Sequence, residues 1–212
     1  MLLGDPIHRI ARNCRSVRAL RIRLSLLAAN LGTTDKFVPR NQRDVDLLNG
    51  FVVLAHAEIQ DNLDSLAKKM LEVTEDLAAR HKLTHCGHHL VIQYLMGPLE
   101  SVRSAREARY PPFEQSQTIR AFMSGTLPLQ KAIDKHKKWV RDNSGIKESN
   151  VRRILMPLGF RETCFDPALM ASLDSLGRDR GSIAHTSSAV GVIHTSSGST
   201  EWVRLRNILA GL

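Results

Sequence analysis

The stretch from Leu173 to His185 holds the residue types in this chain that are best suited to chemistry: Arg178, Arg180 and His185. A histidine with an ordinary pKa of about 6.5 can accept and release a proton at neutral pH. An arginine stays charged and can place two N–H groups on phosphate oxygens. Together these groups suit metal-free cleavage of RNA, in which the 2′-hydroxyl attacks the adjacent phosphate. Arg-x4-His is a short pattern that arises by chance, and a helix end with a solvated polar face is the alternative interpretation.

The helix expected to carry this stretch begins at Asp166, an N-cap residue followed by a proline at the first helical position. On an ideal helical wheel, Arg180 continues a seam of leucines, whereas Arg178 lies with His185 on the opposite, polar side. An arginine in an apolar seam must extend to solvent, pair with a carboxylate or face a charged ligand. Both arginines are therefore candidate partners of the one histidine.

Two glycines bear on the choice between the arginines. Gly177 and Gly181 each destabilise a helix interior by about 1 kcal/mol relative to alanine, so we expect the helix to loosen or end near the motif. Loosening would bring Arg180 and His185 together, although about 140° separates them on an ideal wheel.

A long central helix is predicted over residues 44–80, with Asn41 or Asp44 as its cap. It is too long and too apolar on one side to stand alone, so it should lie in the core. Within it, His56 and Glu58 form an ionisable pair beside the apolar face. Residues of this kind are more often structural hydrogen-bonding groups than catalysts.

The first part of the chain is predicted to form a basic amphipathic helix over residues 7–31, with one apolar stripe and arginines on its other faces. Such a charge run can follow a phosphate backbone or an acidic membrane surface, or it can be a solvated polar face. We expect residues 1–40 to form this helix and a connection, ahead of a helical domain at 41–212.

A second basic cluster follows in the helical region predicted at 117–142, which we expect to break near Pro128. Its end is rich in lysine and carries Trp139, which could stack on a nucleobase. A buried Trp139 under a solvated lysine face is the alternative.

The densest group of possible metal ligands is His81, His85, Cys86, His88 and His89. Several of these pairs have the spacing that would share a helix face and hold zinc. We expect Gly87 to interrupt that helix, and no second cluster supplies the remaining ligands. We therefore predict a histidine-rich turn and no metal site, within an insertion or mobile loop at 80–116.

Composition narrows the class of protein. The chain has 212 residues, a formal charge of +9 and a pI near 9.9, which favours an anionic partner such as nucleic acid. No apolar run approaches the roughly 20 residues that cross a bilayer, and no signal peptide is evident. The three cysteines are widely spaced and suggest neither disulfides nor a zinc site. We expect a soluble cytoplasmic protein with no membrane partner and no cofactor.

Four segments together resemble the HEPN superfamily, most closely its RiboL-PSP branch. They are Ser-Asn-Val-Arg-Arg-Ile-Leu-Met-Pro-Leu-Gly-Phe at 149–160, Leu-Asp-Ser-Leu at 173–176, Arg-Gly-Ser-Ile-Ala-His at 180–185 and Ala-His-Ala-Glu at 55–58. The resemblance covers residues 145–186 well and 44–210 loosely. It implies an all-α, HEPN-like helical bundle, here with an extra N-terminal helix.

The resemblance also implies a homodimer in which paired Arg-x4–6-His motifs line a shared cleft. The implied activity is metal-independent endoribonuclease cleavage of RNA, often by a toxin or anti-phage effector, with an antitoxin or regulatory protein as a further candidate partner. The alternative is a non-catalytic HEPN module that binds RNA or a protein.

Residue by residue, the resemblance assigns His185 as general acid and base, Arg180 as the phosphate-binding group and Glu58 as a supporting group on the neighbouring helix. The chain departs from the family at Gly181, where a polar residue usually follows the arginine. Arg178 satisfies the longer spacing with a polar residue after it. The register therefore stays open between Arg178 and Arg180, and the Ile-Ala-His context favours Arg180.

Overall fold

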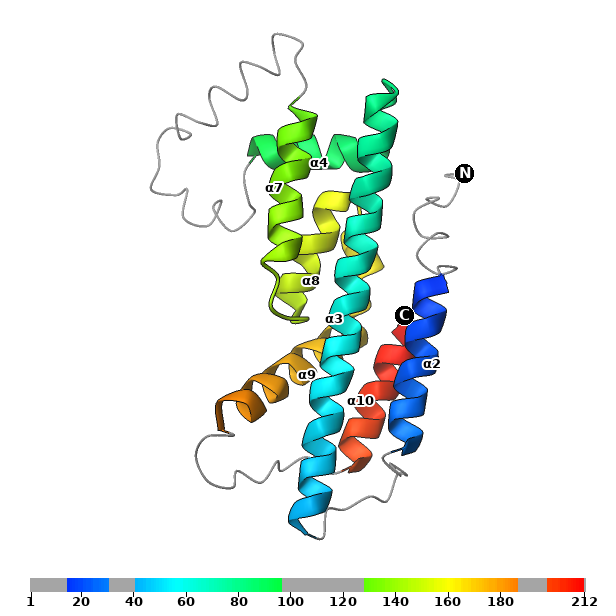
Figure 1. The fold of residues 1–212 in the computed structure, drawn as a ribbon, viewed down its shortest axis with the longest axis vertical. Coiled ribbons are helices and arrows are strands. Elements are labelled where there is room, and N and C mark those ends of the chain that lie inside the picture. The colour runs from blue at the N-terminus through cyan, green and yellow to red at the C-terminus, as the bar shows by residue number, and fades with distance from the viewer. Residues whose placement is uncertain (1–14, 31–40, 97–127, 187–197, 212) are drawn as a thin grey trace. The chain divides into compact units, whose positions relative to one another are not determined.

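The computed structural model describes residues 15–30, 41–96, 128–186 and 198–211, and Figure 1 shows their helices. Every regular element in these ranges is helical, and none of the described residues forms a strand. The all-α prediction is confirmed, and the HEPN-like detail stays a prediction. Within the described part of the chain, no helix combines the length and apolar character needed to cross a bilayer.

The chain divides into two compact units. Unit 1 is drawn from Met1–Ser65, Ser144–Arg152 and Arg161–Leu212, and unit 2 from Leu66–Asn143 and Arg153–Phe160. Helix α3 (Gln42–Ala79) begins in unit 1 and ends in unit 2, as does the short helix α8 (Glu148–Leu155). Helix α2 (Arg15–Asn30) belongs to unit 1 together with the part of α3 that ends at Ser65, and the predicted domain boundary near residue 41 stays a prediction.

The long central helix is confirmed as α3. Its N-terminus is capped by Asn41, whose side-chain oxygen accepts the backbone N–H of Asp44 at 3.0 Å, which satisfies a donor that the helix itself cannot pair. Buried residues recur every three or four positions along its unit 1 portion, namely Val45, Leu48, Val52, Ala55 and Ile59. This period places one face of the helix in the core.

The described part of unit 1 contains further helices besides α3 and the start of α8, including the 3₁₀ turn η2 (Glu162–Cys164). Helix α10 (Gly198–Gly211) contacts both α2 and α9 (Pro167–Thr186), and α2 and α10 run side by side in Figure 1. Leu20 and Leu24 of α2, one turn apart, are 1% and 0% exposed.

Helix α9 starts where the sequence predicted, with Pro167 as its first residue and the carboxylate of Asp166 accepting the N–H of Leu169 at 2.8 Å. The expectation that it loosens near the motif is wrong, because α9 continues through Gly177 and Gly181 to Thr186. Gly177 is buried, and a Cβ there would lie 2.9 Å from Lys147 Cγ. This glycine therefore permits close packing rather than a break.

Unit 2 is built around α4 (His85–Met96), α7 (Leu129–Arg141) and the 3₁₀ turn η1 (Met156–Leu158). α4 packs against both α7 and η1, and Lys137 of α7 forms a 2.7 Å ion pair with Glu75 of α3. η1 ends at Gly159, whose φ of 97° favours glycine.

The expectation that Gly87 interrupts the histidine-rich segment is wrong, because Gly87 lies within α4. The hydroxyl of Thr84 accepts the Gly87 N–H at 2.9 Å and so caps the first turn of this helix. Part of the stretch at 80–116 is thus a packed helix. Residues 97–127, which include the rest of the predicted insertion and part of the helical region expected at 117–142, lie outside the described residues.

Candidate functional site

The motif residues occupy the second half of α9. Arg178 and His185 are seven positions apart, which on a continuous helix places them about 10 Å apart along the axis and within about 20° around it. Arg180 lies about 140° away from His185 around the same helix. Because α9 does not loosen, the backbone places Arg178, not Arg180, on the histidine's side.

Both arginines of the motif are exposed. Neither forms an ion pair with any carboxylate among the described residues, whereas Asp179 between them does. A guanidinium that is solvated and not held by a carboxylate keeps its donors available for an anionic ligand.

Arg180 has a second histidine as its neighbour, which sequence reasoning did not pair with it. His56 of α3 is only 4% exposed. Burial lowers the pKa of His56, and the positive charge of Arg180 lowers it further, so the imidazole is neutral at neutral pH. The sequence showed His56 only as a polar residue beside an apolar face. Its proximity to Arg180 depends on how α3 and α9 pack within unit 1.

Glu58, the predicted supporting carboxylate, pairs with a different helix. Its Oε2 accepts a hydrogen bond from Nη1 of Arg23 on α2 at 2.8 Å, and both side chains are partly exposed. This ion pair links α2 to α3 in unit 1. The catalytic supporting role of Glu58 stays a prediction.

A buried ionic network fixes the motif segment of α9 to α10. Nη2 of Arg204 lies 2.7 Å from Oδ2 of Asp179, and Nη1 of Arg204 lies 2.8 Å from Oε2 of Glu201. Glu201 is 1% exposed and Arg204 is 9% exposed. Because Asp179 is held in this way, the two flanking arginines point away from that contact on a supported helix.

A surface groove lies beside Arg178, lined in part by Glu148, Glu162, Asp166 and Asp174. Arg152 also lines this groove. Its guanidinium forms ion pairs with Glu148 and Glu162 and lies 5.0 Å from the Phe165 ring centroid. Ion pairing to these carboxylates more than offsets the effect of burial, so the pKa of Arg152 is raised. The excess of carboxylates disfavours a polyanion inside this groove, so an anionic ligand of Arg178 would have to approach from the His185 side of α9.

Unit 2 presents a basic and aromatic cluster, which we define as Tyr94, Lys135, Trp139 and Arg153. The Nζ atom of Lys135 is 5.2 Å from the Tyr94 ring centroid and 5.5 Å from that of Trp139, and Arg153 Cζ is 5.2 Å from the Trp139 centroid. These distances are typical of cation–π contacts. Trp139 is half-buried, and Lys135 and Arg153 are exposed. Trp139 is thus partly packed and lies beside two exposed cations, while its stacking on a nucleobase stays a prediction.

The histidine-rich segment has mainly packing contacts. The His85 and His89 rings meet edge to face with centroids 4.4 Å apart, and Cys86 is buried. Burial raises the pKa of the Cys86 thiol, although a hydrogen bond with Thr74 opposes the shift. Among the described residues, no group of three or more histidine, cysteine or acidic side chains is arranged to hold a metal ion.

Comparisons of the chain with protein-family models, with curated proteins and with solved structures found no match. The relationship to the HEPN superfamily therefore stays a prediction drawn from the four sequence segments. Function is argued below from the site itself.

Proposed function

We propose that this protein is a metal-independent endoribonuclease whose reacting groups are carried by α9. The observation that supports the proposal most directly is the placement of Arg178 and His185 on one side of a continuous helix, two turns apart. The net charge of +9 supports an RNA substrate.

The proposed reaction needs one proton acceptor and one anion-binding group. His185 takes the proton from the ribose 2′-hydroxyl, the 2′-oxygen attacks the adjacent phosphorus, and the bond from phosphorus to the 5′-oxygen breaks. The protonated imidazole then gives its proton to the departing 5′-oxygen. The products are a 2′,3′-cyclic phosphate and a 5′-hydroxyl end.

Arg178 is assigned to the phosphate in this proposal because it shares the side of α9 that carries His185. Its guanidinium can place two N–H groups on the non-bridging oxygens, whose charge increases in the transition state. Arg180, on the other side of α9 and close enough for its charge to act on His56, is assigned to RNA binding away from the reacting phosphate.

A homodimer is part of the proposal, with the α9 helices of two copies lining one cleft. This arrangement would give each site arginines from both copies. A toxin or anti-phage role in the cytoplasm, controlled by an antitoxin or other regulatory protein, would follow from RNA cleavage of this kind.

The experiment that tests the proposal compares wild-type protein with His185→Ala on single-stranded RNA and transfer RNA. We expect wild-type cleavage and at least a 1,000-fold lower rate for the variant, on the order of what a proton-transfer group contributes. The matched control is His88→Ala, which removes an exposed histidine of unit 2 and should cleave like wild type. Undiminished cleavage by His185→Ala would refute the assignment.

A non-catalytic RNA-binding module is the second candidate, favoured by the separate basic and aromatic cluster in unit 2. Such a module would retain RNA in a salt-dependent way without changing its ends. The absence of any cleaved product from wild-type protein, together with retention of RNA, would favour this function.

A further inference from the structure

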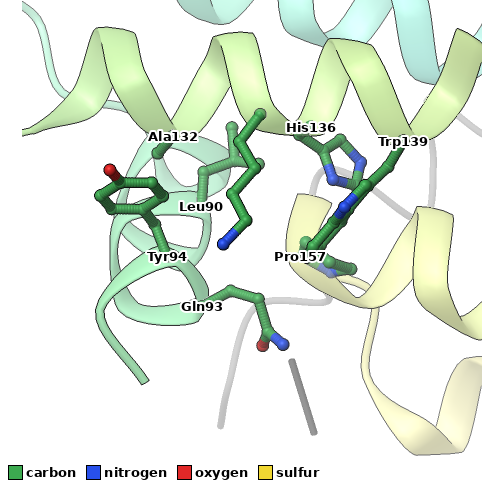
Figure 2. A pocket seen from close by; sticks show the side chains of 8 residues that line it. Leu90, Gln93, Tyr94, Ala132, His136, Trp139 and Pro157 are labelled. Carbon is green, nitrogen blue, oxygen red and sulfur yellow. The ribbon is translucent and has the colours of Figure 1, made fainter. Parts of the chain in front are cut away.

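Tyr94 and Trp139 bound a small cavity in unit 2 at opposite ends, as Figure 2 shows. The cavity floor is apolar, since Leu90 and Ala132 are 2% and 3% exposed and Pro157 is also buried. Two aromatic walls over an apolar floor form a surface on which a flat ring can stack.

Lys135 is one of the residues that line this cavity, and its ammonium approaches both aromatic rings. Its ammonium lies within 5.5 Å of both aromatic ring centroids, and the free volume is about 10 Å³, which is room for roughly one water molecule. Lys135 is exposed, and a lysine side chain rotates easily between solvent and an apolar surface. Rotation of this one side chain would open the space between Tyr94 and Trp139.

A buried histidine in the cavity lining points independently to a polar ligand. His136 is 2% exposed, and its Nε2 lies 2.9 Å from the carbonyl oxygen of Ile154. Burial holds the pKa of His136 down to about 4, so the ring is neutral and Nε2 carries the proton that it donates to Ile154. Nδ1 is then a buried acceptor, and it has no hydrogen-bond partner among the described residues. A buried acceptor left unmatched is costly, and an N–H group of a ligand would satisfy it.

The surrounding charge favours a ligand with a phosphate backbone. Lys135 and Arg153, which lie at the two aromatic rings, are exposed and form no ion pair with described carboxylates, whereas Lys137 is held by Glu75. The cations at the rim of the cavity are therefore available to pair with phosphate groups, because carboxylates do not neutralise them. Single-stranded RNA combines unstacked bases with phosphates, as this surface requires.

We propose that the space between Tyr94 and Trp139 is a binding site for one unstacked base of single-stranded RNA. Lys135 leaves the cavity and pairs with a backbone phosphate, the base stacks against the aromatic rings, and an amino or imino N–H of the base faces His136. This proposal rests on RNA being the substrate of the proposed nuclease, and it adds a substrate-anchoring site in unit 2.

Binding is measured with a fluorescently labelled single-stranded oligoribonucleotide of mixed sequence and protein carrying His185→Ala, so that cleavage does not interfere. In this background, Trp139→Leu and Tyr94→Leu are each expected to weaken binding about tenfold or more, since both remove a stacking face and keep an apolar side chain. The salt dependence should keep its slope, because no cation is lost.

The matched control is Lys131→Ala, which removes an exposed charge from the same helix outside the cluster and should weaken binding only about twofold. Thermal unfolding followed by circular dichroism verifies that each variant is folded. Equal affinity for folded Trp139→Leu, Tyr94→Leu and parent protein would overturn the proposal. So would a Lys131→Ala effect as large as theirs, since this would mean binding by diffuse charge alone.

A second readout uses the intrinsic fluorescence of Trp139. The chain has two tryptophans, so a Trp202→Phe variant leaves Trp139 as the only reporter. Stacking predicts quenching by the single-stranded oligonucleotide and little quenching by a duplex of equal length. Identical signals from both RNAs, or none from either, would contradict base stacking. Neither result depends on cleavage, so the failure of the nuclease proposal is distinguishable from the failure of this one.

Discussion

Arg178 and Arg180 are two residues apart, but they have different surroundings. Arg178 borders a groove rich in carboxylates and shares the His185 side of α9, while Arg180 lies near the neutral, buried His56. The sequence favoured Arg180 because of its Ile-Ala-His context. The continuous helix instead supports Arg178 as the partner of His185 within one copy of the chain.

Separate alanine variants test this distinction. We expect Arg178→Ala to lower the single-turnover cleavage rate at least about 100-fold, as the loss of a transition-state donor does. Arg180→Ala should raise the RNA concentration needed for half-maximal rate more than it lowers the rate itself. Arg206→Ala, an exposed arginine of α10 in the same unit, is the control for loss of one charge. The reverse pattern would restore the Arg180 register.

His136 makes stability depend on pH. Its pKa is held to about 4 in the folded protein, below the usual 6.5, so the unfolded chain binds more protons between these pH values. The free energy of unfolding should therefore fall as the pH drops from 6.5 to 4, by up to about 3 kcal/mol in total. The pKa of His56 is also lowered and adds to the loss in the same direction.

Urea unfolding at pH 7 and pH 5 measures the effect. His136→Gln keeps a donor for the Ile154 carbonyl but cannot titrate, so its stability should change less between the two pH values than that of the wild type. If the stability of His136→Gln depended on pH as strongly as that of the wild type, His136 would not be the group that makes stability depend on pH.

At the scale of elements, local signals predicted the helix ends well. Three residues set helix ends within their own segment of the chain: Asp166 before Pro167, Asn41 before α3 and Gly159 after η1. Such local signals can be recognised from the sequence alone. The glycines were misjudged because their roles depend on neighbours. Gly87 is held in α4 by the Thr84 cap, and Gly177 allows Lys147 to pack closely.

Gly181 offers a test of whether α9 acts as a straight helix. A Cβ at this position would meet nothing within 4 Å, so Gly181→Ala should raise the free energy of unfolding by about 1 kcal/mol. If Arg178 and His185 act together on a straight α9, cleavage should be unchanged. A stabilised but inactive variant would instead indicate that α9 must bend, as the Arg180 register requires.

The Asp179–Arg204–Glu201 network is the contact that holds the motif segment to α10. Arg204→Met would leave the buried carboxylate of Glu201 without its guanidinium partner, at a cost of about 3–5 kcal/mol. Chemical denaturation followed by circular dichroism measures the loss. The double variant Glu201→Gln with Arg204→Met also removes the buried charge of Glu201 and should recover part of the stability. No recovery would argue that packing, rather than charge pairing, holds α9 in place.

At the scale of the whole molecule, the sequence indicated the helical class and the basic character but not the two units. Each unit is assembled from segments far apart in the chain, and α3 and α8 belong to both. Periodicity describes one helix at a time and carries no information about which helices meet. The effect of the Arg180 charge on His56, and the approach of Lys135 to both Tyr94 and Trp139, could not be predicted for the same reason.

Two RNA contacts are proposed in different units: the reacting groups on α9 in unit 1 and a base-stacking site in unit 2. Their tests are independent, because binding is measured in the His185→Ala background and cleavage is measured with the aromatic residues intact. Together they would define a nuclease that anchors its substrate away from the scissile phosphate.

The central claim is metal-independent cleavage by 2′-hydroxyl attack. The most direct measurement is mass spectrometry of RNA ends after incubation with wild-type protein or His185→Ala in excess EDTA. The account predicts 2′,3′-cyclic phosphate and 5′-hydroxyl ends from the wild type and intact RNA from the variant. Intact RNA from both proteins, 5′-phosphate ends, or cleavage only when a divalent metal ion is restored would contradict it.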